Sequence, residues 1–229
     1  MAISTLHIIA CPNCHKIHQK HVIIGGFPSY TWSDLLVVGR GGNPYGNLKI
    51  NACPHCNHFF WVHSEYTLGV LKYDSPLEWK EAPEADEQFD FNFWKHLVEI
   101  QFFENEEEEC YVRLHTWQTY NHFFRNEQGI SGAFYGFFHN DSNYQPNNTL
   151  IEFNKQNISR LYQILPSKSE ENWLLKAEIQ RHLENWEECV KICRKAEKNL
   201  KDGHYLRVAF RKMRKLAQEQ HSKVVQIFS

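Results

Sequence analysis

The chain has 229 residues and a formal net charge of −2 at pH 7, with 42% of its residues hydrophobic and 14% aromatic. This length and composition allow a buried core, which excludes a disordered or low-complexity protein. No apolar run approaches the ~18 residues of a membrane-spanning helix, and MAISTLHIIA lacks the basic start of a secretory signal, so we expect a soluble, cytoplasmic protein.

The charges are distributed unevenly along the chain. Residues 1–63 carry four Lys or Arg and one Asp, a net of +3. Residues 64–150 carry five positive and sixteen negative side chains, a net of −11, and residues 151–229 carry sixteen positive and ten negative, a net of +6. The simplest interpretation is that these are solvated helix faces that complement each other, and the alternative is a surface for a charged partner.

Two Cys-Pro-x-Cys pairs mark the N-terminal part. Cys11 and Cys14 are separated by 38 residues from Cys53 and Cys56. Zn²⁺ binds four thiolates at tetrahedral corners, each about 2.3 Å from the metal, and two short cysteine turns supply that geometry. The four thiolates leave no position for water or substrate, so we predict a structural zinc site. Iron in a rubredoxin-like site uses the same ligands and stays an alternative.

Short β-prone runs flank both cysteine pairs, namely LHIIA, HVIIGG, LKINA and FFWV, and they predict a zinc ribbon within residues 1–70. The spacer exceeds the usual ~15–20 residues, so the ribbon must carry an insertion, FPSYTWSDLLVVGRGGNPYGN, in which DLLVV could add a strand. We expect this insertion to be an exposed loop that displays Trp32 and Asp34.

Three histidines, His15, His18 and His21, recur at every third position after the first cysteine pair. Residues three apart on a strand lie on opposite faces, so these side chains would not converge on a second metal. We expect histidines near the cysteines to donate hydrogen bonds or to shield the sulfurs from water.

Residues 71–90 are rich in proline and acidic side chains, and we predict an acidic linker there. After it, apolar residues recur at spacings of three and four, which is typical of helices. The segment 129–145 interrupts this pattern with glycine and aromatic residues. Pro166 and Ser169 mark a helix end and a helix N-cap. The predicted helices cover residues 91–103, 106–124, 151–165, 170–183, 186–199 and 203–221.

The segment NWLLKAEIQRHLENWEECVKICRKA has large and small residues at the packing positions of one tetratricopeptide repeat. One unit is fewer than the three or so that a freestanding solenoid needs, so it must pack on neighbouring helices. The same positions predict that Cys189 and Cys193 are core residues rather than metal ligands, and Cys110 is interpreted in the same way. The predicted fold class is therefore α+β, a small β zinc ribbon followed by an all-α, tetratricopeptide-like domain in residues 91–229. The repeat positions are Trp173, Ala177, Trp186, Cys189, Cys193 and Ala196.

Five motifs together resemble a group of bacterial proteins in which an N-terminal cysteine-pair ribbon precedes a tetratricopeptide-like helical domain. These motifs follow in order along nearly the whole chain, and in that group a glycine often stands where this chain has Leu35. The resemblance implies the architecture and no particular reaction. The motifs are YTWSD, CPHCNHFFW, YVRLHTWQTYNHFFR, LLKAEIQRHLENWEECVKI and FRKMRKLAQEQHSKVVQI.

The sequence contains no glycine-rich phosphate loop, no His-Glu-x-x-His motif and no nucleophile elbow. The leading hypothesis is therefore a non-enzymatic, zinc-stabilised adaptor or scaffold that binds another protein. Nucleic-acid binding through the basic C-terminal part is an alternative, and an iron electron carrier is a third. The candidate partner-binding residues are Trp32, Asp34, Lys195, Lys198, Arg211 and Arg214.

Overall fold

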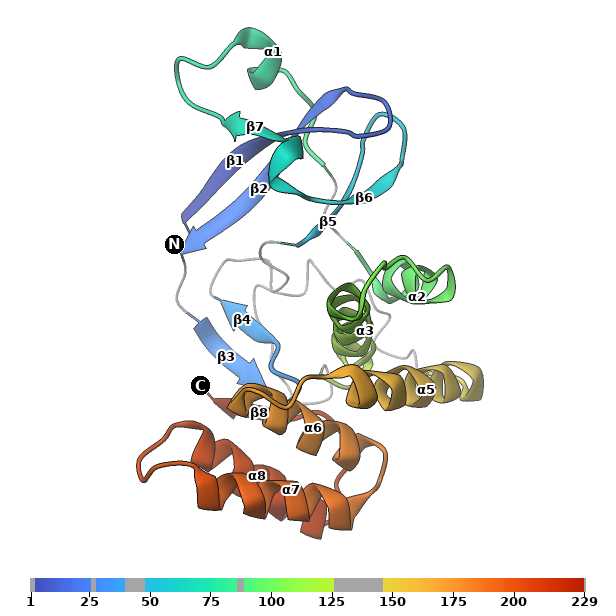
Figure 1. Cartoon of the computed structure of the whole chain (residues 1–229), viewed down its shortest axis with the longest axis vertical. Helices are drawn as coiled ribbons and strands as arrows, with labels where there is room; N and C mark the ends of the chain where they lie inside the picture. Colours follow the sequence, from blue (N-terminus) through green and yellow to red (C-terminus); the bar gives the residue numbers. More distant parts are fainter. Residues whose placement is uncertain (1–2, 26–27, 40–47, 86–88, 126–145, 229) are drawn as a thin grey trace. The chain divides into compact units, whose positions relative to one another are not determined.

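The computed structural model describes residues 3–25, 28–39, 48–85, 89–125 and 146–228. The chain divides into two compact units, of which unit 1 comprises Met1–Ser29 and Val38–Gln88, and unit 2 comprises Tyr30–Val37 and Phe89–Ser229. Strands dominate unit 1 and helices dominate unit 2, as the element labels in Figure 1 show. The α+β class is thus confirmed. The predicted aromatic segment 129–145 lies outside the described residues.

Unit 1 contains a three-stranded antiparallel sheet in the order β2-β1-β7 and a separate two-stranded hairpin of β5 and β6. In the sheet Leu6 pairs with His21, and in the hairpin Asn51 pairs with Phe60. Each cysteine pair lies in the turn between two paired strands. The β-prone runs predicted around the cysteines are therefore strands. Their bounds are β1 Ile3–Ala10, β2 Ile17–Gly25, β5 Ile50–Ala52, β6 Phe59–Trp61 and β7 Thr67–Val70.

The chain after β7 lies along the outer edge of β2. The Gln19 N–H donates to the Pro83 carbonyl, and the Ala85 N–H donates to the Gln19 carbonyl, both at 2.8 Å. The Gln19 side chain also donates to the carbonyl of Trp79 at 2.8 Å, in the short helix α1 (Leu77–Lys80). Up to Ala85, the segment predicted as a linker is therefore hydrogen-bonded to the sheet of unit 1.

The helices of unit 2 lie close to the predicted ranges. Asp90, Asn105, Asn147 and Ser169 each cap a helix, because their side chains accept a hydrogen bond from the backbone N–H three residues later. Within the described residues, no helix combines the length and apolar character that crossing a bilayer requires. The helices are α2 Phe91–Glu99, α3 Glu106–Tyr120, α4 His122–Arg125, α5 Asn148–Ile164, α6 Glu170–His182, α7 Trp186–Asn199 and α8 Leu206–Gln218.

Three of these helices end in the same backbone motif without glycine. Gln101, Glu184 and Gln220 adopt φ values of 53°, 61° and 54°, in the left-handed region. After each of them, the next residue donates its N–H to the carbonyl five residues earlier, as Asn185 does to Gln180 at 2.8 Å. This is the Schellman arrangement, which satisfies the last carbonyls of a helix.

The core of unit 2 forms where α6, α7 and α8 pack together, and small side chains allow the close approach of these helices. Ala177, Cys189 and Cys193 are fully buried there, so the prediction that the two cysteines are core residues is confirmed. Cys110 is only half-buried and packs against the neighbouring cluster around Trp117.

The insertion segment Tyr30–Val37 belongs to unit 2 and pairs with the C-terminus. Strand β3 (Pro28–Trp32) lies between β4 (Val37–Gly39) and β8 (Gln226–Phe228), with Thr31 opposite Phe228. The expectation that Trp32 and Asp34 lie on an exposed loop is wrong, because their exposed fractions are 3% and 0%. Both side chains are covered by partners distant in sequence, so neither offers surface to another protein.

Asp34 is the centre of a buried polar network. Its carboxylate accepts hydrogen bonds from the Arg125 guanidinium and from Asn121 Nδ2, the latter at 2.8 Å, and its carbonyl accepts one from Gln118 Nε2 at 3.1 Å. The guanidinium of Arg125 also lies 5.1 Å from the ring centroid of Trp32, within the range of a cation–π contact. The network joins residues 84 to 91 positions apart, which holds the insertion on α3 and α4.

Leu35 follows this network with φ 58°, a left-handed conformation that costs a residue with a Cβ about 1–2 kcal/mol. Its side chain packs against two hydrophobic clusters of unit 2, and this burial offsets the backbone cost. A glycine would avoid the cost but would lose the packing.

Replacement of Asp34 by alanine should destabilise unit 2 strongly. Removal of one partner of a buried ion pair leaves an uncompensated charge, here on Arg125, and costs roughly 3–5 kcal/mol. Urea unfolding followed by helical circular dichroism measures the change. Asp202→Ala is the matched control, because Asp202 pairs with Arg207 at the surface with a 97% exposed side chain. Equal stability losses in the two variants would contradict the role assigned to Asp34.

The burial of His115 should make unit 2 less stable in mild acid. The ring stacks on Trp94 with centroids 4.7 Å apart, and burial lowers its pKa from 6.5 to about 3. Between these values the unfolded chain binds a proton that the folded chain does not, so the free energy of unfolding falls as the pH falls, by about 1.4 kcal/mol per pH unit. His115→Gln should remove this contribution to the slope of the free energy of unfolding against pH, measured by urea titrations between pH 4 and 6.5. His96→Gln, at an exposed site on α2, should keep it. An unchanged slope in His115→Gln would refute this interpretation.

Candidate metal centre

The four cysteines of the two pairs converge on one point in unit 1. The sulfur atoms of Cys11, Cys14, Cys53 and Cys56 all lie within 4.8 Å of one another. Across the two pairs, Cys11 Sγ lies 3.7 Å from Cys56 Sγ, and Cys14 Sγ lies 3.6 Å from Cys53 Sγ. Four sulfurs placed tetrahedrally at about 2.3 Å from one ion are about 3.8 Å apart, so the spacing fits a single metal ion.

The two cysteine turns have the same backbone conformation. In the first, the Cys11 N–H donates to the Lys16 carbonyl at 3.0 Å and the His15 N–H donates to the Cys11 carbonyl at 2.9 Å. In the second, the Cys53 N–H donates to the His58 carbonyl at 3.0 Å and the Asn57 N–H donates to the Cys53 carbonyl at 2.9 Å. The residue after the second cysteine of each turn is left-handed, with φ 59° at His15 and 55° at Asn57. The repeated sequence pattern therefore produces a repeated structure with both sulfurs facing inward.

The side chains around the cluster fix the turns on the strands. Cys11 and Cys53 are almost fully buried with Ile9 and Phe60, and Cys56 is exposed. His55 Nε2 lies 3.0 Å from the carbonyl oxygen of Ile17, so the second turn is joined to β2. The cluster thus has one face inside the small core of unit 1 and one face toward solvent.

The electrostatics of the sulfurs differ between these two faces. Burial raises the pKa of the Cys53 thiol to about 12 and also raises the pKa of Cys11. The N–H of His58 and the side-chain amide of Asn13 lower the pKa of Cys56 to about 6. Burial therefore disfavours two of the thiolates, and a bound cation is the group that would stabilise all four together.

The three regularly spaced histidines lie in different environments. His18 is buried, and its Nε2 accepts a hydrogen bond from Asn51 Nδ2 at 2.7 Å. Burial lowers the pKa of His18 to about 4, which keeps it neutral at pH 7. His21 is exposed and lies 3.4 Å from a carboxylate oxygen of Glu84, and His15 is in the first cysteine turn. His18 is buried and His21 is exposed because residues three apart on a strand, here β2, lie on opposite faces. His15 lies in the turn before this strand.

The donor set and the spacing of the sulfurs fit one ion that prefers soft ligands. Four thiolates complete a tetrahedral coordination sphere, so an ion held by all of them has no ligand position left for water or substrate. Among the residues that the structure describes, these four cysteines are the group that could hold a metal. The thiolates themselves do not distinguish zinc from iron.

The other candidate partner-binding residues lie on α7 and α8. Lys195, Lys198 and Arg211 are exposed. Arg214 is partly covered, and its Nε donates to Glu197 Oε1 at 2.9 Å. This carboxylate raises the pKa of Arg214 and neutralises its charge. The exposed basic residues of α7 are therefore the better candidates for contact with an anionic partner.

The cysteine pattern alone does not predict a role for Asn13. Asn13, between the cysteines of the first turn, donates from Nδ2 to Cys56 Sγ in the second turn at 3.6 Å. Its position between two cysteines could have indicated this hydrogen bond, because a polar side chain there can reach only the opposite turn or solvent.

Asn13→Ala should weaken metal binding without abolishing it. Loss of a hydrogen bond to a ligand commonly lowers metal affinity about 10- to 100-fold. Competition with a chromophoric chelator measures the affinity, and Asn199→Ala, an exposed position at the end of α7, is the control. An affinity equal to that of the control would show that the hydrogen bond does not tune the site.

Comparisons of the chain with protein-family models, with curated proteins and with solved structures found no match. The resemblance to the bacterial ribbon and helix group therefore stays a prediction, supported in part by the clustered cysteines and the helical C-terminal unit.

Proposed function

We propose that this protein is a cytoplasmic, non-enzymatic adaptor, in which one Zn²⁺ held by Cys11, Cys14, Cys53 and Cys56 stabilises unit 1 and the helices of unit 2 bind another protein. The observation that carries this proposal is the mutual approach of the four sulfurs, all within 4.8 Å of one another. A site with four thiolates is closed to substrate, so its metal acts on folding rather than on chemistry.

The small core of unit 1 supports a structural role for the ion. The hydrophobic cluster at the cysteines contains two of the sulfur residues themselves, with Ile9 and Phe60 as the other buried members. Structural zinc contributes apparent binding energies of about 10–16 kcal/mol, as much as the stability of a whole domain. Zn²⁺ is proposed rather than iron because the ion's role here is to stabilise a unit with a small hydrophobic core. That role needs no change of oxidation state.

A tetratricopeptide-like arrangement is proposed for α6 and α7. They pack together and are joined by Leu183–Asn185, and the predicted small residues Ala177, Cys189 and Ala196 are at most 1% exposed where the helices meet. Helix pairs of this kind present grooves to peptide segments.

Nucleic-acid binding is the second candidate, favoured by a basic row on α7. Lys191, Arg194, Lys195 and Lys198 are exposed at helical spacing and could contact phosphates. Filter binding at two salt concentrations separates the candidates, because phosphate contacts give an affinity that falls steeply with salt.

The purified protein should contain one zinc per chain and be colourless, since a four-thiolate iron site absorbs visible light and a zinc site does not. Cys11→Ser should reduce the zinc content to near zero and expose unit 1 to proteolysis. Cys110→Ser, which removes a half-buried cysteine of unit 2, should keep the full zinc content. A coloured iron protein, or a Cys11→Ser variant with a normal metal content and protease resistance, would exclude the proposed zinc site.

The adaptor role requires a protein partner that binds folded unit 2. Affinity capture with the zinc-loaded chain, quantified by mass spectrometry, should yield a partner that is lost with Asp34→Ala and retained after nuclease treatment. Capture that depends on nucleic acid would support the second candidate instead. Equal yields from the intact chain and from Asp34→Ala would contradict the adaptor role.

A further inference from the structure

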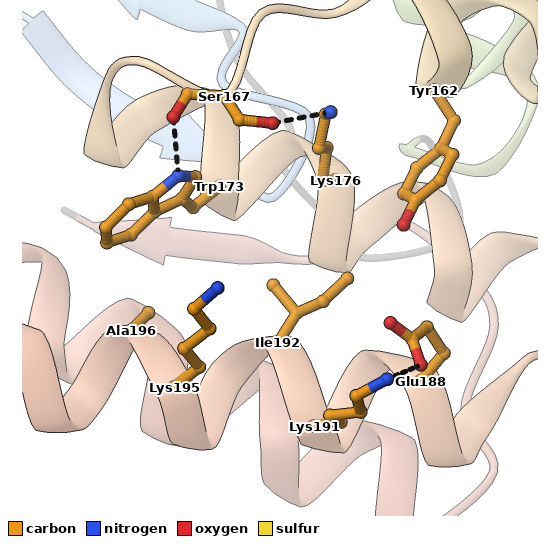
Figure 2. Close-up of a pocket in the computed structure, with 9 residues that line it drawn as sticks. All are labelled: Tyr162, Ser167, Trp173, Lys176, Glu188, Lys191, Ile192, Lys195 and Ala196. Carbon is orange, nitrogen blue, oxygen red and sulfur yellow. Dashed lines mark hydrogen bonds and ion pairs between the residues drawn. The ribbon is translucent and has the colours of Figure 1, made fainter.

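An open groove lies between the end of α5, helix α6 and helix α7 (Figure 2). Trp173 and Lys176 face it from α6, Tyr162 from α5, and Ile192 and Lys195 from α7. Its volume is about 290 Å³. This is at the lower limit of typical ligand pockets, roughly 300–1,000 Å³, and suits a few side chains of a peptide better than a large cofactor.

The walls of the groove are positively charged. Three lysines, Lys176, Lys191 and Lys195, line it together with a single carboxylate, Glu188. Glu188 is paired with Lys191 at 3.0 Å, whereas Lys176 Nζ bonds to an uncharged group, Ser167 Oγ, at 2.8 Å. Lys195 makes no ion pair within the described residues. Two lysines, one on α6 and one on α7, therefore line the groove without a carboxylate to neutralise them.

Apolar side chains contribute a further part of the groove lining. The indole Nε1 of Trp173 donates to the Ser167 carbonyl at 3.0 Å, which fixes the ring at one end. Ile192 and the small Ala196 form the part contributed by α7, and Ile192 points toward α6 in Figure 2. Apolar side chains beside two lysines that no carboxylate neutralises recognise a ligand that combines a carboxylate with an aliphatic side chain.

We propose that this groove binds a peptide segment in which acidic residues alternate with aliphatic ones, with a carboxylate between Lys176 and Lys195 and an aliphatic side chain against Trp173 and Ile192. This inference deepens the proposed adaptor function and rests on it, because it names the chemistry of the partner segment.

A nucleic acid fits the groove less well than an acidic peptide. Single strands bind by stacking of bases on free aromatic faces, but one face of Tyr162 is covered by Lys176, whose Nζ lies 5.3 Å from the ring centroid. The groove itself is lined by ammonium groups and has no guanidinium fork for bidentate contact with phosphate. Ile192 and Ala196 would also contribute nothing to contact with a phosphate backbone.

Fluorescence anisotropy with the zinc-loaded full chain tests the proposal. The probe is a fluorescein-labelled peptide of sequence Glu-Leu-Glu-Leu-Glu-Leu, with two matched peptides in which Gln replaces every Glu or Ser replaces every Leu. We expect saturable binding of the first peptide and at least about tenfold weaker binding of both matched peptides, because one loses the charged hydrogen bonds to the lysines and the other loses the aliphatic side chains. Equal binding of the three peptides, or no saturable binding of the first, overturns the proposal.

Variants of the chain locate the binding. Lys176→Met and Lys195→Met keep the aliphatic stems, and each should weaken binding about five- to tenfold, while Lys195→Arg should restore most of it. Lys215→Met is the control, since Lys215 lies on α8 with a 75% exposed side chain and is not part of the groove lining. Circular dichroism confirms that each variant is folded. A loss of binding with Lys215→Met as large as with Lys195→Met would mean a nonspecific charge effect and would overturn the proposal.

The same assay separates this inference from the adaptor function. A 12-nucleotide DNA that competes with the peptide and binds as tightly, with the same dependence on Lys176 and Lys195, would identify a phosphate surface instead. If the zinc-loaded chain still captures a protein partner while the peptide fails to bind, the groove assignment is wrong and the adaptor role stands. If capture also fails, both are wrong.

Discussion

The fold of unit 1 depends on one constraint, that four sulfur atoms from two distant turns must meet at one point, with a spacing that fits a single metal ion. Each turn is short and uses the same hydrogen bonds, with a left-handed residue after its second cysteine to bring both sulfurs inward. The two hairpins that carry the turns have small cores, and the deepest residues of that core include Cys11 and Cys53. Burial disfavours these two groups as free thiolates, so an ion bound by all four sulfurs would stabilise the fold of unit 1.

Unit 2 is held by a different kind of interaction, in which buried, ion-paired arginines bind segments that are far apart in sequence. Asp34 binds Arg125 at the end of α4. Arg181 and Glu178 on α6 are both fully buried, with Arg181 Nη2 2.5 Å from Glu178 Oε1. Arg181 also donates to the carbonyls of His221 and Lys223, the latter at 2.8 Å, which ties the chain after α8 to the core. These contacts hold the insertion and the segment that leads to the C-terminal strand.

Elements with a local signal could be predicted from the sequence. Repeated cysteine spacing identified both turns, and apolar periodicity with caps such as Ser169 located the long helices, because each signal lies within a few residues of the feature it encodes. The placement of Tyr30–Val37 in unit 2 was not predictable in this way. The partners of Trp32 and Asp34 lie on α3, α4 and the strand Gln226–Phe228, and pairing over such distances leaves no periodic pattern. The helix ends at Glu184 and Gln220 also lack the glycine that usually marks them.

X-ray absorption at the metal edge of the purified protein is the most direct test of a site with four sulfur ligands, because it counts the atoms bound to the ion. The account predicts a zinc edge with four sulfur neighbours at about 2.3 Å and no nitrogen or oxygen in the first shell. A first shell with fewer than four sulfurs and a bound water would mean an open site, and the structural role of the ion would have to be abandoned.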